Sequence, residues 1–311
     1  MGMRARRFAS LGPHGFHRIA YTDWGGSSNS RVVVCMHGLT RNSRDFDWLA
    51  RALQRDYRVV CMDAAGRGES DWLDHKEDYT FRQYQADAAA LIARVTAQER
   101  GVLSSWFGAN GPVDAGSVDW VGTSMGGLIG ILLAAQPHSP FRRLVLNDVG
   151  PFVSWAALMR IKGYAMTRAT YPTFEQAEAV LRQAFASWGP MSEEQWRHLA
   201  RHSIRQTDEG FGFACDPRIA DATSWGFSPE ARLGNRNLLG LEMWGVWERV
   251  RCPVLILRGK DSEVLLAETV RRMCSRDART ETIEFAGVGH APALMSREQI
   301  EPIRAFLRGR D

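Results

Sequence analysis

A serine flanked by two glycines, directly after an apolar run, is the feature that most constrains how this chain folds. The run Val118 to Val121 leads into Gly122-Thr123-Ser124-Met125-Gly126, and helix-compatible residues follow at once. A sharp turn between a strand and a helix brings backbone segments close together, so the positions two residues before and two residues after the serine must be small. The order of strand, G-x-S-x-G and helix therefore predicts a strained turn that exposes Ser124 as a catalytic nucleophile. A structural turn without chemistry is the alternative, because glycine and serine are common in ordinary loops.

Short apolar runs rich in β-branched residues recur along the chain and predict the strands of one sheet. They span residues 31–36, 57–62, 118–121, 143–146, 253–257 and 280–285. Helix-patterned segments lie between several of these runs, at residues 46–54, 79–96 and 124–136. This alternation is typical of an α/β fold with a mostly parallel sheet and helices on both faces. Residues 16–24 are expected to add an antiparallel edge strand.

The alternation stops after Pro151, and helix signals dominate for about a hundred residues. Thr173 with Gln176, and Ser192 with Gln195, have the spacing of capping boxes at the start of helices. We therefore expect residues 151–250 to form a helical insertion, and residues 1–150 and 251–311 to form the domain that carries the sheet.

Composition and patterning exclude several classes of protein. No run of about 18 apolar residues exists, which argues against a membrane span, and the basic amino terminus lacks the apolar core of a signal peptide. A cytoplasmic location is therefore expected. The net charge of +4 is spread along the chain, whereas nucleic-acid binding usually shows a concentrated basic patch. The five cysteines have no C-x-x-C spacing, so neither a disulfide framework nor a zinc site is indicated.

A serine hydroxyl is a poor nucleophile until a base takes its proton, so Ser124 needs a histidine that a carboxylate orients. His290 lies in the glycine-flanked loop Gly287 to Pro292, between the last predicted strand and the final helix. This loop can bend across the ends of the strands, so we predict His290 as the general base. The histidines at positions 14, 17, 75, 138, 198 and 202 lie in termini, polar loops or presumed outer faces of helices, where a solvated role is expected.

The oxyanion that forms when Ser124 attacks a carbonyl needs backbone N–H donors. Met125, directly after the nucleophile, is expected to supply one donor. The loop after the strand at residues 32–36 should supply the second, which places the N–H of Leu39 there. His37 in the same loop is interpreted as a buried structural histidine.

Taken together, these motifs resemble those of the α/β-hydrolase superfamily over essentially the whole chain. The matching segments are His37-Gly38-Leu39, Asp63 to Ser70 (similar to D-x-R-G-x-G-x-S), Gly122 to Gly126, Pro253 to Gly259 and Gly289-His290. The resemblance implies a mostly parallel eight-stranded sheet, a helical cap (lid) formed by the insertion, and Ser124 as nucleophile. It implies a serine esterase-like member that needs no metal or cofactor.

The acid of the expected triad departs from the commonest family pattern. Many members carry it as G-x-x-D after the seventh strand, but the residue three positions after Gly259 is Ser262, flanked by Asp261 and Glu263. The other family arrangement places the acid directly after the sixth strand. In this sequence Asp148 occupies that position. Small esterases of the superfamily that lack the strand-seven aspartate use this position. Asp148 is therefore favoured, with Asp261 and Glu263 as alternatives.

Arg41 and Asn42 follow the expected oxyanion donor closely enough to bind a substrate. Arg41 could reach a substrate carboxylate or a cap residue, or could tie its own loop down by an ion pair.

The expected activity is hydrolysis of carboxylic esters of small or medium-sized molecules through an acyl-enzyme on Ser124, as in a carboxylesterase. A serine in place of an aspartate argues against haloalkane dehalogenase and epoxide hydrolase chemistry. Hydrolysis of a carbon–carbon bond, a lactone or a thioester is the alternative on the same residues, as is lyase or perhydrolase activity. A small-molecule binding protein with slow turnover is the alternative from another class. Substrate specificity and oligomeric state do not follow from the sequence.

Overall fold

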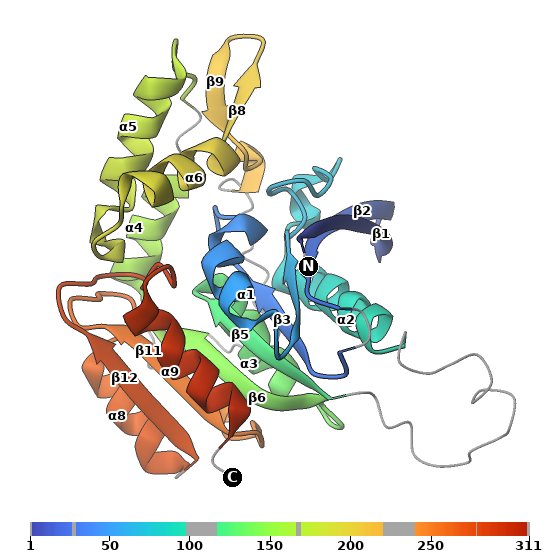
Figure 1. Cartoon of the computed structure of the whole chain (residues 1–311), viewed down its shortest axis with the longest axis vertical. Coiled ribbons are helices and arrows are strands. Elements are labelled where there is room, and N and C mark those ends of the chain that lie inside the picture. The colour runs from blue at the N-terminus through green and yellow to red at the C-terminus, as the bar shows by residue number, and fades with distance from the viewer. Residues whose placement is uncertain are drawn as a thin grey trace, which may run out of the picture.

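The central element of the computed structural model is an eight-stranded sheet (Figure 1). The structure describes residues 2–26, 29–97, 117–165, 169–219, 240–277 and 279–309. The strand order is β1-β2-β4-β3-β5-β6-β11-β12. The strands are β1 (Arg4–Gly12), β2 (Gly15–Trp24), β3 (Val32–Met36), β4 (Arg58–Met62), β5 (Val118–Thr123), β6 (Phe141–Asn147), β11 (Val254–Gly259) and β12 (Thr280–Phe285). Strand β2 pairs antiparallel with both of its neighbours, β1 and β4, and the other neighbouring strands of this sheet pair parallel. The prediction of a mostly parallel eight-stranded α/β sheet is therefore confirmed.

Helices cover both faces of the sheet because its central strands are apolar on both sides. In β3, Val32, Val34 and Met36 belong to one core cluster, while Val33 and Cys35 belong to the cluster on the opposite face. The first face is covered by α2 (Phe81–Ala97), α3 (Met125–Ala134) and α8 (Ala267–Arg276). The second is covered by α1 (Asp47–Leu53) and α9 (Arg297–Arg308) (Figure 1).

The edge of the sheet differs from the prediction. Residues 16–24 do form an antiparallel strand, β2, but this strand lies second in the sheet, and β1 forms the edge. Of the nine residues of β1, only Phe8 and Ser10 are buried. An edge strand that buries so few side chains gives almost no apolar pattern, so the strand at residues 4–12 was not predicted.

Between β6 and β11 the chain forms helices together with two small antiparallel sheets. The helices are α4 (Trp155–Ala165), α5 (Phe174–Ala184), α6 (Glu193–Ser203) and α7 (Trp244–Trp247). The strand pairs are β7 (Phe152–Ser154) with β10 (Gly240–Glu242), and β8 (Ile204–Thr207) with β9 (Gly210–Phe213). Two short 3-10 helices, η3 (Ala186–Trp188) and η4 (Pro217–Ile219), lie in the same segment, and two others, η1 (Ser43–Phe46) and η2 (Lys76–Asp78), lie earlier in the chain. The helical content was expected, whereas these three- and four-residue strands are too short to give a periodic signal.

Both predicted capping positions start helices. Ser192 and Gln195 form the complete reciprocal capping box of α6, and Thr173 accepts a hydrogen bond from the Gln176 N–H at the start of α5. In Figure 1, α4, α5 and α6 lie together above one end of the sheet. Residues 166–168 and 220–239 of the expected insertion lie outside the described residues. The division into a core of 1–150 and 251–311 and a cap of 151–250 stays a prediction.

Candidate active site

The turn between β5 and α3 holds Ser124 in a strained backbone conformation. Its φ is 50° and its ψ is −114°, a conformation that costs a residue with a side chain about 1–3 kcal/mol. A Cβ atom at Gly126 would collide with the carbonyl of Met36, and a Cβ atom at Gly122 would collide with the backbone of Gly126. The two glycines of the motif are therefore required because backbone segments approach closely on both sides of the serine.

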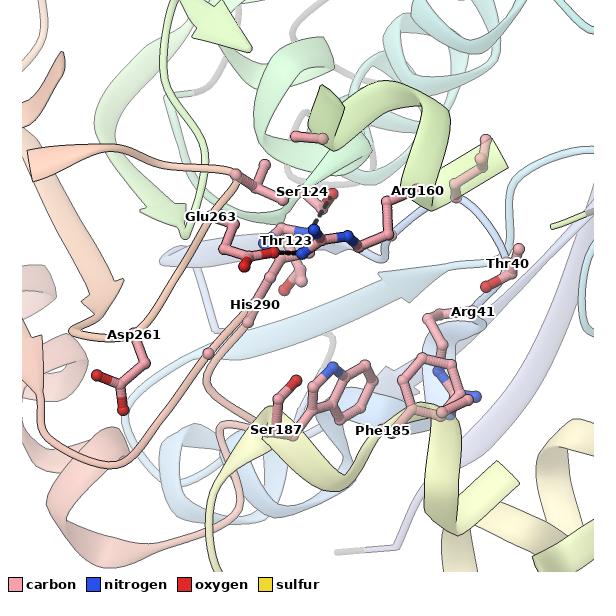
Figure 2. Close-up of a pocket in the computed structure, with 18 residues that line it drawn as sticks. Thr40, Arg41, Thr123, Ser124, Arg160, Phe185, Ser187, Asp261, Glu263 and His290 are labelled. Carbon is pink, nitrogen blue, oxygen red and sulfur yellow. Dashed lines mark hydrogen bonds and ion pairs between the residues drawn. The ribbon is translucent and has the colours of Figure 1, made fainter. Parts of the chain in front are cut away.

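Three side chains from three loops form a continuous chain of hydrogen bonds. His290 Nε2 lies 2.9 Å from Ser124 Oγ, and His290 Nδ1 lies 2.6 Å from Asp148 Oδ2 (Figure 2 draws the Ser124 and His290 pair). Ser124 follows β5, Asp148 follows β6 and His290 follows β12, so the carboxyl ends of three strands bring them together. With Asp148 ionised, Nδ1–H donates to the carboxylate, and Nε2 is left to accept the serine proton.

The carboxylate of Asp148 is fully buried and is held by donors from the loop after β11. The Gly259 N–H donates to Oδ1 at 2.9 Å, and the Ser262 hydroxyl donates to Oδ2 at 2.5 Å. Ser262 Oγ in turn accepts the N–H groups of Val264 and Leu265, each at 3.2 Å. The serine at the position where many family members carry the acid therefore supports the aspartate of the neighbouring loop. The sequence marked this position as unusual but did not show that its hydroxyl contacts Asp148.

The two alternative acids lie elsewhere in the same cavity. Asp261 lines the pocket, but its carboxylate points away from His290 (Figure 2). Glu263 forms an ion pair with Arg160 of α4. Among the described residues, the carboxylate hydrogen-bonded to His290 is that of Asp148.

The expected oxyanion donors lie on two loops that meet at Ser124. The loop after β3 passes so close that a Cβ atom at Gly38 would lie 3.6 Å from the Cβ of Ser124. Within the described part of the chain, neither the Leu39 N–H nor the Met125 N–H has an acceptor. Met125 is the first residue of α3, where an N–H has no partner inside the helix. Both groups can therefore donate to a bound oxyanion.

A buried arginine connects these two loops. Arg67 is fully buried, its Nε donates to the Leu39 carbonyl at 2.7 Å, and its Nη2 lies 3.7 Å from the Met125 sulfur. Its Nη1 also donates to the carbonyl of Ala65 at 2.7 Å and to the hydroxyl of Tyr84 at 2.6 Å. Arg67 belongs to the motif at residues 63–70, but its position between the loops depends on tertiary packing that a single sequence does not show.

His37 has the surroundings of a structural histidine. It is fully buried, its Nδ1 donates to the Gly38 carbonyl at 2.6 Å, and its Nε2 accepts the Ala64 N–H at 3.0 Å. Burial lowers the pKa of His37 to about 3, and the nearby Arg67 and Arg41 add to this effect. The imidazole is therefore neutral at physiological pH and fixes the loop that carries Leu39.

Arg41 and Asn42 both make contacts with the residues between β6 and β11. The Arg41 guanidinium forms a two-point ion pair with Asp45, at 3.0 and 2.6 Å, and lies over the rings of Phe185 and Trp188. The Asn42 amide donates to the His202 carbonyl of α6 at 3.0 Å. Arg41 lines the pocket at Ser124, and Asn42 lies outside that lining. These contacts favour a role for Asn42 in joining its loop to α6.

Ser124 and His290 open into a cavity of about 370 Å³ between the ends of the strands and the segment that follows β6. It is lined by the loops after β3, β5, β11 and β12 and, from the segment after β6, by Ala157, Arg160, Phe185, Ser187 and Trp188. In Figure 2, Arg160 lies on one side of this cavity, and Phe185 and Ser187 lie on the other. No group of three or more histidine, cysteine, aspartate or glutamate side chains suited to a metal ion occurs among the described residues. None of the helices in the described ranges has the length and apolar character needed to cross a membrane.

Comparison with known proteins shows the family to which the chain belongs. A family model described as the alpha/beta hydrolase family matches residues 33–302. The chain belongs to the alpha/beta hydrolase family. Among its relatives is the 3-hydroxybutyrate-oligomer hydrolase of Cupriavidus necator, which is 41% identical over 303 residues and is matched over 96% of both chains.

Solved structures show the same alpha/beta hydrolase fold. An alpha/beta hydrolase from Novosphingobium aromaticivorans has a TM-score of 0.79 at 30% identity, with 98% of each chain covered. A protein from Rickettsia typhi has a TM-score of 0.83 at 27% identity, with both chains fully covered. The predicted superfamily and fold are therefore confirmed, and the relatives from Cupriavidus necator and Novosphingobium aromaticivorans are hydrolases by name. The individual roles of Ser124, His290 and Asp148 stay predictions.

We predict that the hydroxyl of Ser262 positions Asp148 in this alpha/beta hydrolase. Ser262→Ala removes a hydrogen bond to an ionised carboxylate, so kcat should fall about tenfold while KM changes little. Steady-state kinetics with a p-nitrophenyl ester would measure this. Ser296→Ala is the control, because Ser296 caps α9 through the Gln299 N–H and does not contact Asp148. An equal loss of kcat in both variants would mean that lower stability, and not Asp148, explains the effect.

Proposed function

We propose that this alpha/beta hydrolase cleaves carboxylic ester bonds through an acyl-enzyme on Ser124, with short oligomers of a hydroxy acid as its substrates. The observation that carries the proposal is the hydrogen-bonded chain from Ser124 through His290 to Asp148 at the wall of a cavity. The hydroxy-acid class is supported by the 41% identity with a 3-hydroxybutyrate-oligomer hydrolase over nearly the whole chain.

The first half of the proposed reaction forms the acyl-enzyme. Ser124 Oγ attacks the ester carbonyl as His290 Nε2 takes its proton, and the carbonyl oxygen becomes an oxyanion that accepts hydrogen bonds from the N–H groups of Leu39 and Met125. Each such donor contributes about 10²–10³ in rate. The C–O bond to the alcohol then breaks, and His290 gives its proton to the departing oxygen.

The second half returns the enzyme to its starting state. His290 takes a proton from water, the resulting hydroxide attacks the acyl carbon, and the oxyanion is stabilised by the same two N–H groups. The bond from the acyl carbon to Ser124 Oγ breaks, and Ser124 regains its proton from His290. Asp148 stays ionised throughout, where it orients the ring and stabilises the imidazolium that forms in each half.

The shape of the cavity supports a substrate longer than a simple ester. A second cavity of about 390 Å³ shares Thr40, Arg41, Ala184 and Phe185 with the first, so the two cavities adjoin. Residues 151–250 would act as the cap of this site over a core of 1–150 and 251–311. In this arrangement, one acyl unit lies at Ser124 and further units extend under the cap.

The experiment that tests the proposal follows product release from defined substrates. Linear dimers and trimers of 3-hydroxybutyrate, p-nitrophenyl butyrate and a butyryl thioester are incubated with the purified protein, and released acid is measured by chromatography. We expect multiple turnovers of the oligomers at a kcat of about 1–10³ s⁻¹, the usual range for enzymes. Preference for the thioester, or one equivalent of product without further turnover, would contradict the proposal.

A further inference from the structure

Two arginines line the cavity at Ser124, and they differ in exposure and in the ion pair that each forms. The guanidinium of Arg41 is nearly inaccessible, with 5% of its side chain exposed, and it is paired at two points with Asp45. Arg160 of α4 has 54% of its side chain exposed, and its partner Glu263 has 63% exposed. Both members of the second pair line the same cavity as Ser124 (Figure 2).

The ion pair of Arg160 and Glu263 connects two parts of the fold. Arg160 belongs to the helix that follows β7, and Glu263 belongs to the loop between β11 and α8. Ion pairs that are this exposed contribute little net stability, because water solvates both charges well and two long side chains lose conformational freedom. A carboxylate from a bound molecule can therefore replace that of Glu263 at little cost.

We propose that Arg160 binds the free carboxylate of the substrate, and that Glu263 occupies this position when no substrate is present. This inference rests on the proposed function. An oligomer of a hydroxy acid has one terminal carboxyl group, which is ionised at neutral pH, whereas simple alkyl and aryl esters have none. A guanidinium can bind such a carboxylate through two parallel hydrogen bonds, and these strengthen as the substrate excludes water from the cavity.

The position of this charge also determines which bond is cut. If the terminal carboxylate is held beside Ser124, the ester carbonyl nearest to it lies at the nucleophile. The departing alcohol is then the terminal hydroxy acid itself. Arg160 is in this way a specificity-determining residue, and the enzyme removes one unit at a time from the carboxyl end. A tetramer should give monomer and trimer first, and not two dimers.

The test compares charged and neutral forms of one substrate in matched variants. The trimer of 3-hydroxybutyrate as free acid, its methyl ester and p-nitrophenyl butyrate are assayed with wild type, Arg160→Gln and Glu263→Gln. Arg197→Gln is the control, because Arg197 is an exposed arginine of α6 that does not line the cavity. For Arg160→Gln we expect KM for the free acid to rise about tenfold to a hundredfold, with both neutral esters within about twofold of wild type.

The second variant reports on the competing carboxylate. Glu263→Gln should lower KM for the free acid about twofold to threefold and leave the neutral esters unchanged, and added salt should raise KM for the free acid alone in the wild type. An Arg160→Gln variant that affects all three substrates equally, or none of them, would overturn the inference. If the wild type hydrolyses no ester at all, the proposed function has failed instead, so the two failures are distinguishable.

Discussion

Replacing Ser124 by alanine is expected to abolish ester hydrolysis while leaving the fold intact. The hydroxyl is the nucleophile that forms the acyl-enzyme in the proposed mechanism, so kcat should fall about 10⁴–10⁶-fold, down to the residual rate that the oxyanion donors and binding supply. The substitution removes one atom from a side chain at the cavity wall, and alanine relieves none of the strain at φ 50°. Turnover of p-nitrophenyl butyrate measures the loss, and circular dichroism checks the fold.

Labelling gives an independent readout of the same residue. A fluorophosphonate should add one equivalent to the wild type, on Ser124, and none to Ser124→Ala, as mass spectrometry of the intact protein would show. Ser187→Ala is the matched control, because Ser187 lines the same cavity and is exposed, but it does not contact His290. Retained turnover in Ser124→Ala, or its loss in Ser187→Ala, would refute the assignment.

Replacing Asp148 by asparagine is expected to lower kcat about 10⁴-fold, because the imidazole is then held in the wrong tautomer. The asparagine amide can donate to His290 Nδ1, which leaves the proton on Nε2, where it blocks acceptance of the serine proton. The Asn Oδ1 still accepts the Gly259 N–H, so the loop should keep its conformation. KM should change little, because Asp148 is buried away from the cavity lining.

The two other carboxylates provide matched controls for this result. Asp261→Asn and Glu263→Gln change charge at the same cavity without removing a contact to His290. On a neutral p-nitrophenyl ester, both should remain within about threefold of wild type. A collapse of kcat in Asp261→Asn, with Asp148→Asn still active, would assign the acid to the loop after β11.

Short sequence patterns predicted those parts of the fold that are determined by neighbouring residues in the chain. The strand at 118–121 and the glycines around Ser124 predict the turn, because a close backbone approach excludes any side chain there. The apolar runs predict the central strands, because parallel strands covered on both faces must be apolar throughout. The family resemblance supplied the position of Asp148 after the sixth strand, and the structure brings this side chain to His290.

The remaining features depend on contacts between distant segments. The hydroxyl of Ser262 reaches a carboxylate 114 positions away, and no local pattern encodes such a pair. Arg160 lies on a helix whose direction relative to the cavity is set by packing. The edge strand β1 buries almost no apolar side chains, so its pairing with β2 is stabilised mainly by backbone hydrogen bonds. Such bonds depend little on the sequence, so they leave no pattern from which the strand could be predicted.

The short pair of β7 and β10 lies next to the loop that carries Asp148. The chain leaves the sheet through β7 and returns through β10, and the Met243 N–H also donates to the carbonyl of Pro151 at 2.7 Å. Asp148 lies just four residues before β7 begins. Because β7 and β10 pair so close to Asp148, the fold joins both ends of the intervening segment to the loop whose carboxylate contacts His290.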